Sequence, residues 1–201
     1  MRHPHYVFSF FHFPMTLTAR LQGTNLYLIG MMGAGKSSTG TALAQALGYQ
    51  FFDTDVVLET VAGRTIAEIF AQEGEDGFRQ QETEVLAQLA AYRRLVIATG
   101  GGIVTQRRNW GHLHHGIVVW LDVPLAVLEQ RLAGETGRPL LQRPDWRQTL
   151  ADLVDQRQPL YAQADVRVPI AAGDTVEVIT AQILSLVDER LRADAPANQL
   201  N

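Results

Sequence analysis

Short apolar runs alternate along this chain with stretches in which apolar residues recur every three or four positions. The first pattern is typical of buried strands and the second of amphipathic helices. Strands and helices alternate five times, which predicts an α/β fold with a five-stranded parallel sheet and helices on both faces. The expected strands are NLYLIG (25–30), QFFDTD (50–55), RLVIATGGG (94–102), GIVVWLDVP (116–124) and DVRVPI (165–170).

Glycines and prolines punctuate the helical stretches between these strands. Gly48 ends the first stretch, Gly63 separates two short ones, and Pro159 interrupts a late one. Asp174 is the expected N-cap of the closing helix, because its carboxylate can accept from the first free N–H groups. The expected helices lie at 36–48, 56–62, 65–73, 75–92, 103–113, 125–133, 146–164 and 174–191.

The two ends of the chain differ in composition from the part between them. Four of the eight Phe fall within the first thirteen residues, in an apolar run too short to span a membrane. We expect a flexible N-terminal tail over 1–22, with Met15 as an alternative start, and a C-terminal tail over 191–201. A single domain should therefore occupy 23–190.

The overall composition narrows the class of partner. The chain has 201 residues, a formal net charge of −4 and no cysteine. A global basic field is absent, so nucleic acid is not an expected partner, and neither a disulfide nor a thiolate site can form. We expect a cytoplasmic monomer without membrane contact. Of the 17 basic residues only Lys36 is a lysine, and it lies in the motif described next.

The segment GMMGAGKS (30–37) fits the phosphate-loop pattern G-x-x-x-x-G-K-[ST]. It follows an expected strand and opens an expected helix, which is the context that the motif requires. Backbone N–H groups of such a loop surround phosphates, while its Lys reaches the β- and γ-phosphates and its Ser binds Mg²⁺. We therefore expect ATP with Mg²⁺ as cofactor. The expected ATP-binding residues here are Gly33, Ala34, Gly35, Lys36, Ser37 and Ser38.

The phosphate loop alone does not say which group receives the phosphoryl. The N-K-x-D motif that reads guanine in GTPases is absent from the sequence. The chain is short for a helicase-like motor and has no basic patch. A kinase of a small molecule is the class that size and motif favour.

Two carboxylates, Asp53 and Asp55, follow an aromatic pair in FFDTD. If both lie in strand conformation, their side chains point to one face, toward the phosphate loop. One could then bind Mg²⁺ through water, and the other could accept the proton of an acceptor hydroxyl. From spacing alone, a solvated turn, or Asp53 as the cap of the helix at 56, explains these residues equally well.

Other segments add groups suited to an acidic acceptor. Arg79 and Glu82 lie three residues apart on one expected helix, so Glu82 can hold the guanidinium in place. Glycines 100–102 end a strand and would let a flat substrate approach the backbone. Arg157 lies near a helix end, and the Gly-, Pro- and Arg-rich segment 134–145 predicts a mobile loop.

Together these pieces resemble the shikimate kinases, P-loop enzymes that phosphorylate the 3-hydroxyl of shikimate. The matching pieces occur in the family's order over about 25–185. They are GMMGAGKS, FFDTD, GRTIAEIF, GEDGFRQQE, TGGG, GRPLL and RQPLY.

The resemblance implies a P-loop kinase fold with a lid at about 133–145 and a role for each matching residue. It makes Asp53 the partner of a Mg²⁺-bound water and Asp55 the group that contacts the acceptor hydroxyl. Arg79 and Arg157 would pair with the shikimate carboxylate, and Gly101 and Gly102 would line the substrate. Arg131 would stack on adenine, and Arg138 would close over the phosphates.

Three matters remain open at this stage. Asp122 ends an expected strand, and we interpret it as a structural cap of the helix after Pro124. A related kinase, such as one for gluconate, would share the phosphate loop. A catalytically silent nucleotide-binding protein on the same fold is the alternative from another class.

Overall fold

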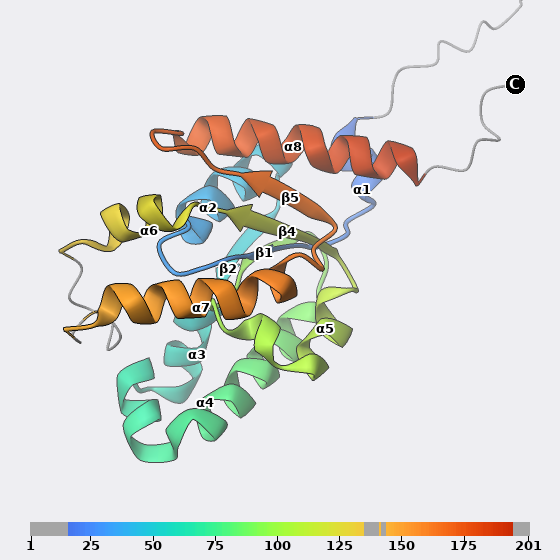
Figure 1. Cartoon of the computed structure of the whole chain (residues 1–201). Helices are drawn as coiled ribbons and strands as arrows, with labels where there is room; N and C mark the ends of the chain where they lie inside the picture. The colour runs from blue at the N-terminus through green and yellow to red at the C-terminus, as the bar shows by residue number, and fades with distance from the viewer. Residues whose placement is uncertain (1–15, 135–140, 142–143, 195–201) are drawn as a thin grey trace, which may run out of the picture.

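The computed structural model describes residues 16–134, 141 and 144–194. Five strands form one parallel sheet in the order β2-β3-β1-β4-β5, as expected from the sequence (Figure 1). The strands are β1 Leu26–Ile29, β2 Gln50–Asp53, β3 Leu95–Ala98, β4 Ile117–Asp122 and β5 Val166–Pro169.

Helices cover both faces of this sheet. Helices α2 and α8 lie on one face, and α5 and α7 lie on the other, with α3 and α4 packed side by side beyond them (Figure 1). The helices are α1 Leu17–Leu21, α2 Lys36–Leu47, α3 Thr54–Ala62, α4 Ile66–Ala90, α5 Arg107–Leu113, α6 Leu125–Leu132, α7 Trp146–Tyr161 and α8 Val176–Ala193, with a 3₁₀ turn η1 at Ile103–Thr105.

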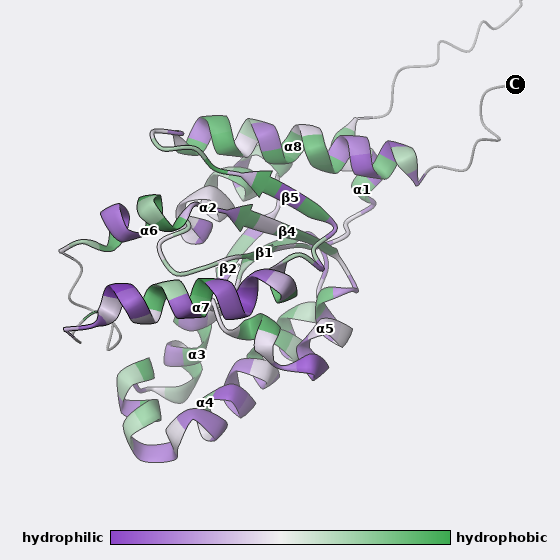
Figure 2. Ribbon diagram, in the orientation of Figure 1, coloured by the Kyte–Doolittle hydropathy of each residue, from purple (hydrophilic) through white to green (hydrophobic). Residues whose placement is uncertain are grey.

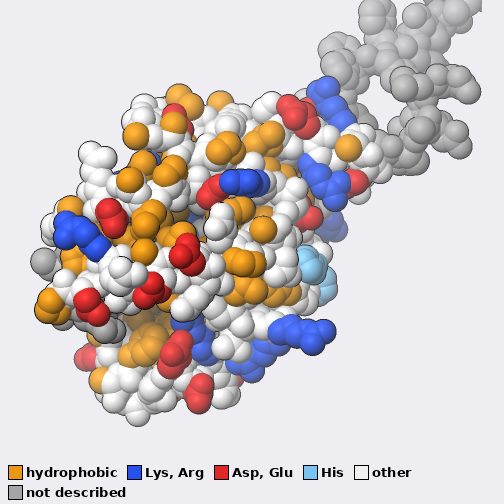
Figure 3. All heavy atoms as spheres, in the orientation of Figure 1, with side chains coloured by type: hydrophobic (Ala, Val, Ile, Leu, Met, Phe, Trp, Pro, Cys, Tyr) orange, Lys and Arg blue, Asp and Glu red, His pale blue; other side chains and the backbone are white. Residues whose placement is uncertain are grey.

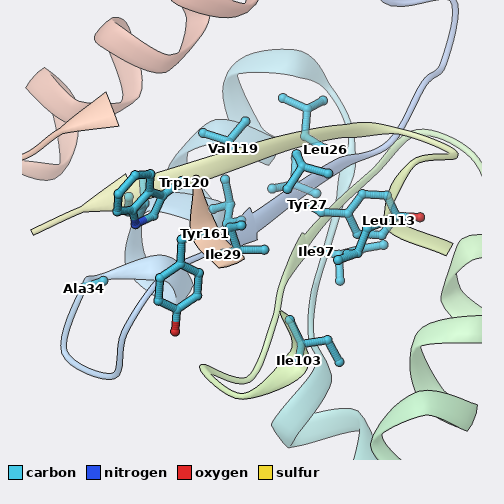
Figure 4. Close-up of a cluster of buried hydrophobic side chains, with 14 of the residues drawn as sticks. Leu26, Tyr27, Ile29, Ala34, Ile97, Ile103, Leu113, Val119, Trp120 and Tyr161 are labelled. Atoms are coloured by element: carbon cyan, nitrogen blue, oxygen red, sulfur yellow. The ribbon is translucent and has the colours of Figure 1, made fainter. Parts of the chain in front are cut away.

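The core lies on both sides of the central strands. All four residues of β1 are fully buried, and so are those of β3. A parallel sheet covered on both faces requires such continuous apolar runs rather than alternation. Figure 2 shows largely apolar strands beside helices of mixed polarity, and Figure 4 shows the buried side chains of these strands packed together. Because the strands are packed on both faces, the loops that follow them are held in fixed positions at the edge of the sheet, where the site lies.

Two differences from the sequence-based element boundaries are informative. The second strand ends at Asp53 rather than at residue 55, because Asp53 is the N-cap of α3 and its side chain accepts from the backbone N–H of Asp55. The two helices expected at 65–73 and 75–92 are continuous in α4, apart from non-helical backbone at Gly74. Each difference arises where a local cap or glycine competes with the apolar pattern.

Two capping predictions were wrong. Asp122 does not cap α6; it pairs with Arg167 on the neighbouring strand β5, at 2.5 Å. Asp174 does not cap α8 either, because Thr175 is the N-cap and accepts from the N–H of Val178. Asp174 instead accepts from the backbone N–H of Ala171 and closes the preceding turn.

Helix α1 falls within the range 1–22 for which we expected a flexible tail. Leu21 is 1% exposed, and Arg20 forms an ion pair with Asp188 of α8. Thr16 caps the helix by accepting from the N–H of Ala19. Residues 16–22 therefore belong to the folded domain. The first thirteen residues, with their four Phe, lie outside the described residues.

The surface is of mixed charge. On the face shown in Figure 3, basic and acidic side chains are interspersed. Within the described part of the chain, none of the helices is long and apolar enough to cross a membrane.

Candidate active site

The phosphate loop joins the end of β1 to the start of α2. Gly33 and Gly35 have positive φ angles of 77° and 89°, which residues with a side chain rarely adopt. A Cβ atom at Gly33 would also lie 3.1 Å from Leu132 of α6. Gly35 is the N-cap of α2 and offers no side-chain acceptor, so the first N–H groups of the helix are not capped by a side chain. These N–H groups and the helix dipole suit an anion.

Two basic side chains lie along this loop. Lys36 donates from its Nζ to the carbonyl oxygens of Gly30 and Met31, at 2.8 and 2.9 Å. Arg131 reaches from α6 and donates to the carbonyl oxygens of Gly33 and Ala34, at 3.3 and 3.4 Å. Both cations therefore lie where a nucleotide on the loop would place its phosphates and flanking groups.

Ser37 and Asp53 form a pair of oxygen donors beside the loop. The Ser37 hydroxyl donates to Asp53 Oδ2 at 2.5 Å, while Asp53 Oδ1 accepts from the N–H of Asp55 at 3.0 Å. Mg²⁺ at nucleotide sites usually takes one or two protein oxygens together with phosphates and waters. A hydroxyl and a carboxylate fit that requirement.

Two carboxylates converge on the glycine loop after β3. A Cβ atom at Gly100 would lie 2.5 Å from Glu82 Oε1 and 2.9 Å from Asp55 Oδ1. Any side chain at Gly100 would therefore collide with one of them. Glycine at this position lets Asp55 and Glu82 approach the same short segment of backbone.

Glu82 and Arg79 form a buried ion pair on α4, as their spacing predicted. Arg79 Nη1 lies 2.7 Å from Glu82 Oε2, and the two side chains are 11% and 1% exposed. Burial raises the pKa of Glu82, the Arg79 guanidinium opposes this shift, and the Asp55 carboxylate adds to it. The second oxygen, Oε1, has no hydrogen-bond partner among the described residues. Glu82 therefore holds Arg79 in place.

Arg79 of α4 and Arg157 of α7 approach adjacent glycines of this loop. A Cβ atom at Gly102 would lie 2.4 Å from Arg79 Nη1, and one at Gly101 would lie 3.7 Å from Arg157 Nη1. Residues from α4 and α7, almost eighty positions apart, thus meet at one loop. Two guanidinium groups this close favour a bound carboxylate.

A hollow of about 310 Å³ lies between the phosphate loop and the glycine loop. Nine of the residues predicted from the sequence line it, and Thr99 and Leu132 join them. Arg79, Arg157 and Gly102 are not among its lining residues, and neither is Ala34, a buried residue of the phosphate loop. Arg138 falls outside the described residues. The lining residues are Gly33, Gly35, Lys36, Ser37, Ser38, Asp53, Asp55, Thr99, Gly101, Arg131 and Leu132.

The strand geometry assumed for the two aspartates was wrong, although both line the hollow. Asp53 ends β2 and caps α3, while Asp55 already belongs to the first turn of that helix. Spacing alone left two alternatives for Asp53, a helix cap or a site residue. In the structure Asp53 both caps α3 and lines the hollow. Helix α3 rather than strand alternation directs Asp55 toward the glycine loop.

Sequence reasoning missed two buried hydroxyl groups next to the site. Thr54 Oγ1 accepts from the N–H of Gly100 at 3.0 Å, and the Tyr161 hydroxyl donates to the carbonyl of Gly101 at 2.6 Å. Both residues stand inside recognised segments, FFDTD and RQPLY. Their role had no signal in spacing, because it depends on contacts between distant parts of the chain.

The parallel sheet, the phosphate loop and the two aspartates that line this hollow are typical of a P-loop kinase of small molecules. A sequence model of the shikimate kinase family matches residues 32–188. The chain belongs to the shikimate kinase family.

Curated relatives agree with this assignment. A shikimate kinase of Trichormus variabilis is 53% identical over 176 residues, which cover 88% of this chain and 97% of that protein. One of Thermosynechococcus vestitus is 56% identical over 170 residues, covering 85% of this chain and 93% of the relative.

Solved structures agree as well. Shikimate kinase from Acinetobacter baumannii in complex with shikimate is 40% identical, with a TM-score of 0.79, and covers 86% of this chain and 97% of that one. A gluconokinase from Sinorhizobium meliloti reaches a TM-score of 0.56 at 19% identity, which shows a shared fold alone. The predicted family and fold are confirmed.

Proposed function

We propose that this chain transfers the γ-phosphoryl group of ATP to the 3-hydroxyl of shikimate, giving ADP and shikimate 3-phosphate. Membership of the shikimate kinase family supports this reaction. The structural observation that carries it is that Arg79 and Arg157 both approach the glycine loop, at Gly102 and Gly101 respectively. A hydroxylated carboxylic acid is the acceptor that such a pair suits.

On the phosphate side, the backbone of the loop and its lysine hold the triphosphate. The N–H groups at Gly33–Ser38 surround the phosphates, and Lys36 exchanges its carbonyl partners for phosphate oxygens. Arg131 lies beside the loop, where it can stack on adenine. We assign Arg138, in the lid expected at 133–145, to the developing charge on the transferred group.

Ser37 and Asp53 would hold the Mg²⁺ that accompanies ATP, Ser37 directly and Asp53 through water. When bound, the ion neutralises charge on the β- and γ-phosphate oxygens. The short hydrogen bond that now joins these two side chains shows that they already lie together.

On the acceptor side, three kinds of group orient the substrate. Arg79 and Arg157 bind the carboxylate, and the backbone of Gly101 and Gly102 lies against the ring. Asp55 accepts a hydrogen bond from the reacting hydroxyl and takes its proton as the new P–O bond forms and ADP leaves. Positioning and charge neutralisation supply most of the rate enhancement.

We further propose that ATP and shikimate are the physiological partners of a monomeric, cytoplasmic enzyme. Closure of the lid at 133–145 would exclude water, which otherwise competes as acceptor. The described residues form one domain around a single five-stranded sheet.

The test is ADP release with ATP and Mg²⁺ in the presence of shikimate, with gluconate and water as comparison acceptors. Of the three acceptors, we expect only shikimate to give rapid ADP release. The product should carry a phosphate monoester on its 3-hydroxyl, which phosphorus NMR identifies. Lys36→Met is the matched inactive control. Release no faster than with water would exclude the activity and favour a silent nucleotide-binding protein, and a preference for gluconate would change the acceptor.

A further inference from the structure

The glycine loop Thr99–Gly102 forms hydrogen bonds with three other elements, and each bond involves a side-chain hydroxyl. Thr99 Oγ1 donates to the carbonyl of Leu28 on β1, at 3.0 Å. The N–H of Gly100 donates to Thr54 Oγ1 at the start of α3, at 3.0 Å. The carbonyl of Gly101 accepts from the hydroxyl of Tyr161, near the end of α7, at 2.6 Å. Thr99, Gly100 and Gly101 are thus each bonded to a different element of the fold.

Holding these groups also sets the direction of their neighbours. A trans peptide is planar, so the C=O of one residue and the N–H of the next point in opposite directions. The bond from Tyr161 to the Gly101 carbonyl therefore also fixes the direction of the N–H of Gly102, which points the opposite way. Glycine otherwise has the widest choice of backbone angles, so the loop depends on such contacts for a single conformation.

Both residues that supply these hydroxyl groups are almost completely buried. Thr54 and Tyr161 are each 1% exposed. In Figure 4 the Tyr161 ring lies near the ring of Trp120, and its hydroxyl points toward the loop that leads to Ile103. Burial raises the pKa of Tyr161 to about 12, so the hydroxyl keeps its proton and remains a donor at working pH. Removing either hydroxyl therefore leaves a buried backbone group without its hydrogen-bond partner.

The same two residues stand next to the groups that bind the acceptor. Thr54 lies between Asp53 and Asp55 at the start of α3. Tyr161 follows Arg157 by one helical turn, and the Arg157 guanidinium is close enough to oppose the rise in the tyrosine pKa. Thr54 therefore links the start of α3, which carries Asp55, to the glycine loop. Tyr161 links the end of α7, which carries Arg157, to the same loop.

We propose that Thr54 and Tyr161 are positioning residues of the acceptor site, which hold the glycine loop in the conformation that receives the hydroxylated acid. The inference rests on the proposed function, because it names what aligns the acceptor half of that site. Neither residue lines the hollow or touches the reacting atoms. The Tyr161 hydroxyl also lies 3.4 Å from the Sδ atom of Met31 on the phosphate loop. A thioether sulfur is a weak acceptor, so the bond to the Gly101 carbonyl is the stronger of the two contacts.

The first test is Tyr161→Phe, which keeps the ring packed and removes only the hydroxyl. We expect the KM for shikimate to rise about tenfold, the usual effect of one lost hydrogen bond at such a site, with kcat and the KM for ATP within about threefold. Calorimetric binding of shikimate should weaken by the same factor while ADP binding with Mg²⁺ stays unchanged. Tyr27→Phe is the matched control, a fully buried tyrosine on β1 away from this loop, and should leave both constants unchanged.

The second test separates the Thr54 hydroxyl from its shape. Thr54→Val keeps the volume and should raise the KM for shikimate about tenfold, whereas Thr54→Ser keeps the hydroxyl and should restore it to within about twofold. If wild type is active but the Phe and Val variants keep its KM for shikimate, the inference is overturned while the function stands. Wild type without shikimate-dependent activity would instead sink the proposed function.

Discussion

Asp55 and Glu82 both direct a carboxylate oxygen at Gly100, yet their surroundings give them different chemistry. Glu82 is buried, and its carboxylate forms an ion pair with Arg79. Asp55 lines the hollow and lies opposite the phosphate loop. Of the two, Asp55 is the carboxylate that an acceptor hydroxyl can reach.

Replacing Asp55 by Asn should abolish most of the turnover and leave nucleotide binding intact. The amide cannot take a proton, and a positioned base contributes about 10²- to 10⁴-fold, so we expect kcat to fall by at least about 100-fold. ADP binding with Mg²⁺ should stay within about twofold of wild type. Glu84→Gln, an exposed position on α4, is the control. A variant with wild-type turnover would remove Asp55 from the proton transfer.

Arg157→Ala and Arg79→Ala should both weaken shikimate binding. Only Arg79→Ala should also lower the free energy of unfolding. Each variant leaves the substrate carboxylate one guanidinium short, so we expect its KM to rise at least about tenfold. Arg79→Ala also leaves Glu82 buried without its cation, which costs about 3–5 kcal/mol in the free energy of unfolding.

Two measurements separate these effects. Shikimate amide, which lacks the charge, should bind equally to wild type and to Arg157→Ala, and urea unfolding should report the extra loss in Arg79→Ala. A rise confined to the KM for ATP would show that these arginines belong to the nucleotide side.

At the scale of elements, close packing of α2 on the sheet explains a glycine that helix propensity disfavours. A Cβ atom at Gly40 would lie 2.4 Å from the ring of Phe51 and 3.3 Å from Leu28. Gly40 lets α2 approach β1 and β2, and so fixes the phosphate loop at the start of α2 relative to Asp53 at the end of β2.

Gly40→Ala should therefore destabilise the protein by about 1–3 kcal/mol, although alanine is the better helix former. Gly111 on α5 is the matched control, since a Cβ atom there would meet nothing within 4 Å. Gly111→Ala should leave stability unchanged or raise it by up to about 1 kcal/mol. Urea unfolding of both variants checks the prediction, and a stable Gly40→Ala would show that Phe51 can move aside.

At the scale of the molecule, the first described helix closes the fold against the last. Helix α1 packs on α8, where Leu21 is buried and Arg20 pairs with Asp188. This contact joins residues about 170 positions apart. A composition argument assigned these residues to a tail, because five residues are too few to show a helical period.

Leu21→Ala should lower the free energy of unfolding by about 2–5 kcal/mol, as expected for a large buried side chain. Val61→Ala on α3, where the side chain is 70% exposed, should change it by less than about 0.5 kcal/mol. Thermal or urea denaturation of the two variants tests whether α1 belongs to the cooperative unit. If the two variants were equally stable, α1 would not belong to the cooperative unit.

The sequence by itself determined the parts of this protein that are local. The phosphate loop is one continuous segment whose function depends on backbone N–H groups, glycine conformations and a lysine at fixed spacing, so its pattern can be read directly. The parallel sheet was equally clear, because each buried strand is a short apolar run between helices. The pair Arg79 and Glu82 followed from helical spacing alone.

Only the tertiary structure decided what depends on contacts between distant residues. It ended β2 at Asp53, brought Arg79 and Arg157 to the same glycines, and placed the hydroxyls of Thr54 and Tyr161 against that loop. Spacing along the chain carries no information about such meetings, because they follow from the order of the strands and the packing of helices on the sheet. The acceptor half of the site is therefore a product of topology, whereas the phosphate half is a product of sequence.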